Sequence, residues 1–259
     1  YFVAGSRPLI GVHKILDALY GEAERCAGVW DDRHNLARGQ AVAPGLKTWL
    51  DLGGNEEALR RGRAQMGPGA EQVARLVLNA GWTPRRVELP VGHAVLGIGT
   101  GIDLFCTDAE GKAVLIEVKV AGAANWQENA FKQLTLTVGV DQATGQPITR
   151  AYGYTARLRA FLQLLMTRLL FEKTFPSIPV AACFVVHVTF GMHGPRTVNA
   201  DLHPAPEGWM EAVGKYDMIP KLLGRIQAVK GKTERVKKPK AEGGSKGGGR
   251  KGGRAGTAD

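Results

Sequence analysis

Apolar side chains recur with the three-to-four-residue period of a helix in five parts of the chain. Pro68 suits the first turn of one such segment and Gly81 its end, while Thr155 is a suitable N-cap for the longest one, which Pro176 follows. Helices are therefore predicted over residues 8–27, twice within 29–66, over 67–81, over 155–175, and once or twice within 204–229.

The segments between these helices alternate apolar and polar residues or are continuously apolar, which is typical of strands. Asp108 and Gly111 supply the turn chemistry between two of them, and residues 141–146 supply that of a hairpin. Strands are expected at residues 85–91, 94–106, 113–120, 134–140, 147–154 and 179–190. This order predicts an α/β fold with a mixed central sheet flanked by helices.

The strand "AVLIEVKV" carries charge on one of its two faces. Side chains alternate along a strand, so Ile116 and Val118 share one face while Glu117 and Lys119 share the other. Asp103 lies in the preceding strand, and a tight turn brings it close to both charged residues. A solvated edge strand is the plain alternative for the Glu-x-Lys pattern taken alone.

Two carboxylates and a lysine on adjacent strands need a reason, because uncompensated charge in a sheet interior is costly. Mg²⁺ binds oxygen ligands, often one or two carboxylates with several waters, and Mn²⁺ can substitute. Such an ion polarises a phosphoryl oxygen and lowers the pKa of bound water. Lys119 would then orient or deprotonate that water, or stabilise charge on phosphorus. The alternative is a structural ion-pair cluster.

"GTGID" followed by "IEVKV" resembles the metal-binding motif of the PD-(D/E)XK nucleases. The resemblance implies a restriction-endonuclease-like core in which Asp103 and Glu117 hold the metal and Lys119 is catalytic. The RecB-like and λ-exonuclease-like branch adds a Glu on a preceding helix and a Gln on a following helix. Glu71 matches the first as a further metal ligand, and Gln163 matches the second as a catalytic residue.

The resemblance covers roughly residues 67–187 and has departures. Ile102 stands where the family often has Pro, and residues 121–150 form an insertion, so Gln133 is an alternative to Gln163. Glu71 also suits an ordinary helix N-terminus, where the dipole favours a carboxylate, and Gln163 suits a partly buried helix position. Tyr154 and Arg157 are further candidates for phosphate contacts, and Trp126 is a candidate for base stacking or for core packing.

Charge is unevenly placed in this chain of 259 residues, of which 44% are hydrophobic. The net charge is +10, and the last thirty residues contribute +7 of it, with nine glycines and one large apolar side chain, Val236. Such a segment predicts a disordered basic tail that attracts phosphate polyanions; the alternative is a solubility or linker tail. The nucleic-acid-binding residues expected there are Lys237, Lys238, Lys240, Arg250, Lys251 and Arg254.

Several function classes find no support in the sequence. No run approaches the roughly 18 apolar residues of a membrane span, no GxxxxGK[ST] is present, and no serine lies in GxSxG. His187, His193 and His203 lack the supporting spacing of a zinc site. Three dispersed cysteines and no secretory signal predict an intracellular protein, in the cytoplasm or, from the basic "VKKPK", the nucleus.

The expected organisation has three parts: an N-terminal helical region (1–66), a nuclease-like core with the insertion (67–229), and the basic tail (230–259). The function expected is Mg²⁺-dependent hydrolysis of phosphodiester bonds, with DNA as the partner and RNA as the alternative. A catalytically silent nuclease-like protein that binds or packages nucleic acid is a second hypothesis, and a structural subunit of a larger particle is a third. The sequence does not identify protein partners.

Overall fold

The structure is a computed structural model of all 259 residues. It describes residues 3–4, 7–21, 33–120, 126, 132–190 and 198–225. Contacts within the chain group Tyr1–Leu223 into one compact unit and Gly224–Asp259 into another. Only Gly224 and Arg225 of the second unit are described, so the six expected tail residues lie outside the described part. Residues 1–66 belong to the same compact unit as the rest of the described fold.

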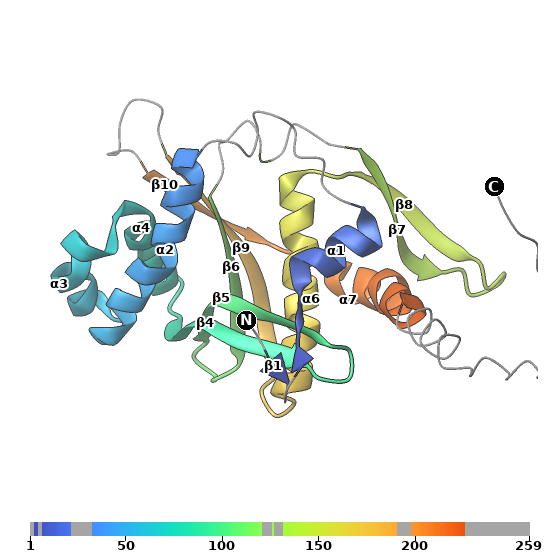
Figure 1. The fold of residues 1–259 in the computed structure, drawn as a ribbon, viewed down its shortest axis with the longest axis horizontal. Helices are drawn as coiled ribbons and strands as arrows, with labels where there is room; N and C mark the ends of the chain where they lie inside the picture. Colours follow the sequence, from blue (N-terminus) through green and yellow to red (C-terminus); the bar gives the residue numbers. More distant parts are fainter. Residues whose placement is uncertain are drawn as a thin grey trace, which may run out of the picture. The chain divides into compact units, whose positions relative to one another are not determined.

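A mixed six-stranded sheet forms the centre of the first unit (Figure 1). Its order is β10-β9-β6-β5-β3, with β4 pairing with β5. Strand β6 is antiparallel to β5 and parallel to β9, and β3 is parallel to β5. The strands are β3 (Ile10–Gly11), β4 (Thr83–His93), β5 (Ile98–Thr107), β6 (Ala113–Val120), β9 (Val180–Phe190) and β10 (Val198–Pro204). The predicted mixed α/β architecture is confirmed.

Helices cover both faces of this sheet, as Figure 1 shows. One buried apolar cluster joins the sheet to α1 (Val12–Tyr20), α6 (Ala156–Thr174) and α7 (Trp209–Val213). The other joins it to α2 (Arg33–Asp51) and α4 (Pro68–Asn79), with α3 (Glu56–Met66) between them in the chain. Successive side chains of β6 point to opposite faces of the sheet, so β6 contributes to both clusters. Leu115 belongs to the first cluster and Ile116 to the second.

Two small additions stand beside the main sheet. Strands β1 (Val3–Ala4) and β2 (Arg7–Pro8) pair antiparallel. Strands β7 (Gln133–Val140) and β8 (Pro147–Gly153) form the hairpin predicted from the sequence, which begins in the expected insertion and ends three residues after it. A tight turn closes this hairpin, where Asp141 accepts hydrogen bonds from the backbone N–H groups of Ala143 and Thr144.

Helix α6 forms for the reasons its sequence suggests. The hydroxyl of Thr155 caps it by accepting a hydrogen bond from the backbone N–H of Leu158, at 3.1 Å. Most of its residues between Ala156 and Phe171 are buried, so the helix is apolar nearly all round and passes through the interior. The same burial fixes the direction in which Gln163 points.

Four elements differ from the sequence-based expectation. Helix α1 begins only at Val12, because the two preceding residues pair with β5 as β3. Helix α2 is longer than expected and continues through Pro44. Strand β10 was not predicted, and the C-terminal helical region contains a π-helical turn, η1 (Gly214–Met218).

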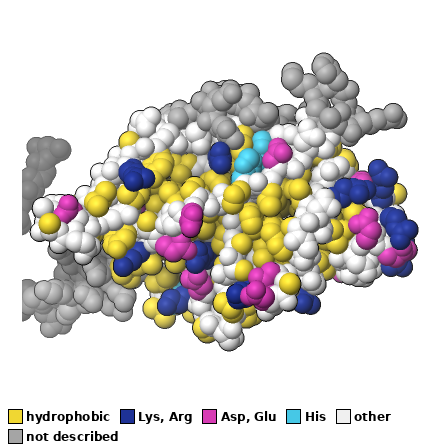
Figure 2. Space-filling view, turned by 180° about the vertical axis from the view of Figure 1, so that it is seen from behind, with side chains coloured by type: hydrophobic (Ala, Val, Ile, Leu, Met, Phe, Trp, Pro, Cys, Tyr) yellow, Lys and Arg dark blue, Asp and Glu magenta, His cyan; other side chains and the backbone are white. Residues whose placement is uncertain are grey.

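The surface of the described residues carries both signs of charge. Figure 2 shows basic and acidic side chains in small separate groups among apolar ones on the face turned away in Figure 1. Among the described helices, none combines the length and apolar character needed to cross a bilayer.

Candidate active site

Asp103 and Glu117 lie where two neighbouring strands part. The β5–β6 ladder runs from Thr107 opposite Ala113 to Leu104 opposite Ile116, and Asp103 and Glu117 are the next residues on the two strands. There the side chain of Asp103 replaces the ladder: its Oδ2 accepts a hydrogen bond from the backbone N–H of Val118, at 2.7 Å. The separation of the strands therefore leaves both carboxylates at one end of the pairing.

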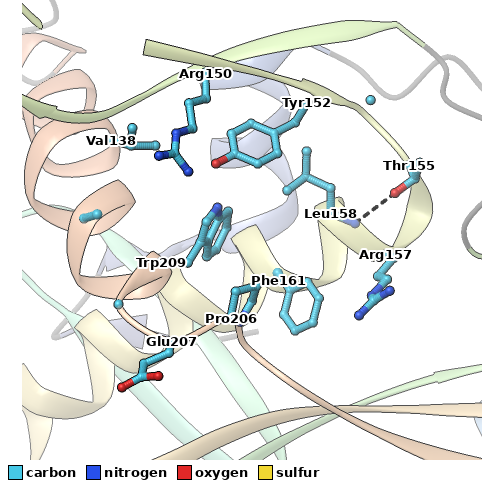
Figure 3. A pocket seen from close by; sticks show the side chains of 13 residues that line it. Val138, Arg150, Tyr152, Thr155, Arg157, Leu158, Phe161, Pro206, Glu207 and Trp209 are labelled. Carbon is cyan, nitrogen blue, oxygen red and sulfur yellow. Dashed lines mark hydrogen bonds between the residues drawn. The ribbon is translucent and has the colours of Figure 1, made fainter. Parts of the chain in front are cut away.

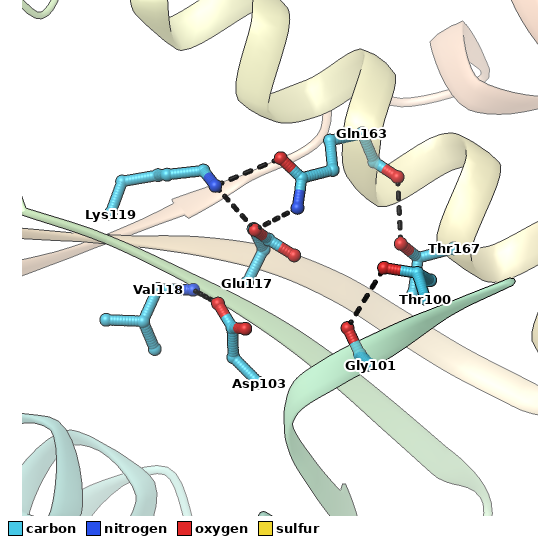
Figure 4. Close-up of polar contacts among 8 residues, drawn as sticks. All are labelled: Thr100, Gly101, Asp103, Glu117, Val118, Lys119, Gln163 and Thr167. Carbon is cyan, nitrogen blue, oxygen red and sulfur yellow. Dashed lines mark hydrogen bonds and ion pairs between the residues drawn. The ribbon is translucent and has the colours of Figure 1, made fainter. Parts of the chain in front are cut away.

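Lys119 and Gln163 converge on Glu117 (Figure 4). The Lys119 ammonium donates to Glu117 Oε1 at 2.6 Å and to Gln163 Oε1 at 3.0 Å. The Gln163 amide nitrogen donates to the same Glu117 Oε1, which closes a triangle of hydrogen bonds. The other oxygen, Glu117 Oε2, is buried and meets no donor in the part of the chain that the structure describes. The Glu117 and Asp103 carboxyl groups lie close enough to share a hydrogen bond when one of them is protonated.

Burial governs the electrostatics of this group. Glu117 is 1% exposed, and its burial, together with the charge of Asp103, raises its pKa to about 8. Burial also raises the pKa of Asp103, although Lys119 and the N–H of Val118 oppose the shift. The pKa of Lys119 is raised because its two carboxylate neighbours outweigh its desolvation. At neutral pH the lysine is thus charged, and the carboxylate pair favours retaining a proton.

These side chains line a cavity of about 530 Å³. It is bounded by β5 and β6, by α6 at Gln163, and by the middle of α2, including Gln40 and Lys47. Two further residues of interest line it: His13, from the first turn of α1, and Glu88, from β4. Lys119 lines this cavity and keeps a quarter of its side chain exposed.

Sequence reasoning missed His13 and Glu88. Glu88 falls opposite Asp103 in the β4–β5 register and has a φ of 52°. Its negative charge further raises the pKa of Asp103. Partial desolvation and the cations of Lys119 and Arg159 lower the pKa of His13 below its usual range, so the imidazole is neutral at pH 7. Both are exposed polar residues of ordinary elements, and no local sequence signal distinguishes them.

Glu71 does not join the site in this structure. Its carboxylate accepts hydrogen bonds from Arg63 and Arg75 and lines a separate hollow formed by α3 and α4. Burial raises its pKa, but the two arginines outweigh burial and hold it below the usual range. The match to a family position therefore led to a structural ion-pair residue, and the expected role of Glu71 as a metal ligand is corrected accordingly.

The remaining candidates are dispersed. Gln133 is exposed at the start of β7 and does not line the cavity, whereas Gln163 does. Tyr154 is fully buried, and its hydroxyl accepts a hydrogen bond from Arg159 at 3.0 Å. Arg157 lines a different cavity. Trp126 is buried, with its ring stacked on that of His187 at 4.2 Å between centroids, which is a packing role.

The metal-binding capacity of the site rests on few ligands. Among the described residues, no three His, Cys, Asp or Glu side chains gather closely enough to hold an ion by themselves. A site with the Asp103–Glu117 pair and several waters suits Mg²⁺ or Mn²⁺, which retain much of their hydration. The unpartnered Oε2 of Glu117 is an acceptor that a cation would satisfy. The side chains present therefore fit a hard divalent cation.

Comparison of the sequence with models of known protein families, and with curated proteins, gives no match.

Proposed function

We propose that this protein is a metal-dependent nuclease that hydrolyses phosphodiester bonds in DNA, on a core of the restriction-endonuclease-like type. The observation that carries the proposal is the meeting of Asp103, Glu117 and Lys119 at the parting of β5 and β6, where two neighbouring carboxyl groups line a cavity and one oxygen of Glu117 meets no donor among the described residues.

The carboxylates and the lysine of the site have different roles. Asp103 and Glu117 would hold Mg²⁺ or Mn²⁺, which when bound polarises the phosphoryl group and acidifies a water. Lys119 is held in place by Glu117 and Gln163. Its ammonium would stabilise the negative charge that develops on the phosphoryl oxygens. Because the lysine is protonated beside two carboxylates, it serves as a stabilising cation and not as the base.

His13 and Glu88 give the site acid–base capacity at the cavity wall. The neutral imidazole of His13 can accept a proton from the attacking water or pass one to the leaving oxygen. Glu88 adds negative charge beside Asp103 and can hold metal-bound waters by hydrogen bonds.

The proposal is tested by incubating the purified full-length chain with labelled plasmid, linear duplex and RNA in Mg²⁺, Mn²⁺ or EDTA. Cleavage of DNA that requires a divalent ion is expected. Tight binding of DNA without cleavage under any of these conditions would reject the proposal in favour of a catalytically silent binding protein. Cleavage of RNA alone would change the substrate assignment.

A further inference from the structure

A second cavity of about 730 Å³ lies between the β7–β8 hairpin, the start of α6 and the segment that leads into α7. It shares no lining residue with the cavity at Asp103 and Glu117. Its volume is in the range of pockets that hold small organic ligands, about 300–1,000 Å³. The β7–β8 hairpin, which lies outside the main sheet, forms one wall of this cavity.

Aromatic rings form the interior of this second cavity. Phe161 and Trp209 lie 6.3 Å apart between centroids, and both are more than nine-tenths buried. Tyr152 approaches from β8, half-buried, with its side chain directed toward Trp209 (Figure 3). The indole N–H of Trp209 donates to no acceptor among the described residues, so it remains available to a ligand.

Two guanidinium groups stand at the edge of these rings. Arg150 points from β8 toward Trp209 in Figure 3, and Arg157 lies over the ring of Phe161, 5.6 Å from its centroid. Neither forms an ion pair with a carboxylate in the part of the chain that the structure describes. Glu207 is the carboxylate in the lining, which leaves the cavity with more basic than acidic groups.

We propose that this second cavity binds a nucleotide, with the base against the aromatic side chains and the phosphate held by Arg150 and Arg157. Flat π-faces accept any base, and the planar fork of a guanidinium matches a phosphate. The two sources of such a ligand are an unpaired stretch of DNA and a free nucleotide. As a site for the DNA strand, the inference rests on the proposed nuclease function and gives it a preference for single-stranded substrate regions.

The position of the second cavity separates its role from catalysis. Residues two apart on a helix point about 200° from each other, so Phe161 and Gln163 face opposite sides of α6. The cavity therefore anchors nucleic acid away from the cleaved bond, and its loss should raise KM while leaving kcat unchanged.

Binding of fluorescently labelled oligothymidylate, measured by anisotropy in EDTA, tests the inference without cleavage. A fluorescent adenine nucleotide serves as the free-nucleotide probe. Salt near 0.2 M suppresses non-specific attraction to the basic tail. The variants are Tyr152→Ala and Arg157→Gln, with Tyr152→Phe as the conservative change. Lys173→Gln is the matched control, because Lys173 is an exposed cation at the other end of α6.

Tyr152→Ala should bind about five- to a hundred-fold more weakly, in keeping with the loss of one base stack. Arg157→Gln should also weaken binding, while Tyr152→Phe and Lys173→Gln retain wild-type affinity. The probe that shows this pattern identifies the source of the nucleotide. Unchanged affinity of Tyr152→Ala and Arg157→Gln for both probes, or no binding of either probe by the wild type, would overturn the inference.

Cleavage by the same variants in Mg²⁺ keeps the two proposals distinguishable. Tyr152→Ala and Arg157→Gln should raise KM and leave kcat unchanged. If no variant and no wild-type protein cleaves DNA while the binding pattern holds, the nuclease proposal fails and the nucleotide cavity stands.

Discussion

The ammonium of Lys119 lies 2.6 Å from one oxygen of the buried Glu117 carboxylate, while the other oxygen of that carboxylate has no partner among the described residues. One oxygen of this carboxylate therefore positions the lysine, and the other is left for a proton or a cation. Burial and the neighbouring Asp103 carboxylate also make the protonation of Glu117 depend on pH near neutrality.

The stability of the metal-free protein should fall as pH rises toward 8. Burial and Asp103 raise the pKa of Glu117 from 4.5 in the unfolded chain to about 8. Between these values the folded state holds more protons than the unfolded state, so the free energy of unfolding decreases with increasing pH. The expected loss exceeds about 1.4 kcal/mol, the equivalent of one pKa unit.

Glu117→Gln removes the titrating carboxyl group, so the free energy of unfolding should fall less steeply with pH. The variant should be more stable than the wild type at pH 8. Urea denaturation of both proteins between pH 4.5 and 8 measures the difference in their free energies of unfolding. The lowered pKa of His13 makes stability rise with pH, but this contribution is the same in both proteins and cancels in the difference. Divalent ions should stabilise the wild type and leave the variant unaffected. Parallel pH profiles for the two proteins would count against a protonated Glu117.

Lys119→Ala should lower the rate of cleavage by about 10²–10³-fold, the usual effect of removing one preorganised donor of positive charge. Calorimetric titration with Mn²⁺ should still detect binding, because the lysine is not a ligand. Gln163→Ala should cost less, since Glu117 still holds the ammonium. Loss of metal binding together with unfolding in Lys119→Ala would favour the structural ion-pair cluster.

Much of the fold was visible in the sequence because local signals and tertiary packing agree there. Helices α4 and α6, the β7–β8 hairpin and the strand of Glu117 were expected and are present. Strand β10 was missed because "VNADLHP" is polar, and its pairing with β9 is what makes it a strand. Helix α1 was overextended because the residues of β3 are apolar in either structure.

The site was predictable where the motif lies in adjacent strands and unpredictable where it depends on packing. Asp103, Glu117 and Lys119 are brought together by one turn, and Gln163 by a buried helix. His13 reaches the cavity because α1 docks on α6, where Asp17 pairs with Arg159 at 2.7 Å. Glu71 fitted a sequence position, but Arg63 and Arg75 hold it elsewhere.

His13→Ala should reduce kcat by about 10²-fold, the lower end of what acid–base groups contribute. Its melting temperature should stay close to that of the wild type, because His13 is not among the buried core residues of α1. Lys14→Ala is the matched control on the adjacent, exposed position of α1 and should retain activity. Equal rates for His13→Ala and wild type from acidic to alkaline pH would show that the imidazole takes no part.

Deletion of residues 230–259 removes a net charge of +7 and little apolar surface. The melting temperature should change little, and DNA affinity should fall with a flatter salt dependence. A decrease of about three to six in the slope of log affinity against log salt is expected if part of the ten basic side chains contact phosphates. An unchanged slope would contradict the tail's electrostatic role, and a melting point many degrees lower would show that it is part of the fold.

The most direct test of the central claim compares cleavage of labelled DNA by the wild type, Asp103→Asn and Glu110→Gln in Mg²⁺ and Mn²⁺. Glu110 is an exposed carboxylate in the turn between β5 and β6, so its variant controls for the loss of one negative charge. The wild type and Glu110→Gln should both cleave DNA in a metal-dependent manner, and a folded Asp103→Asn should not. Wild-type cleavage rates in Asp103→Asn would contradict this claim.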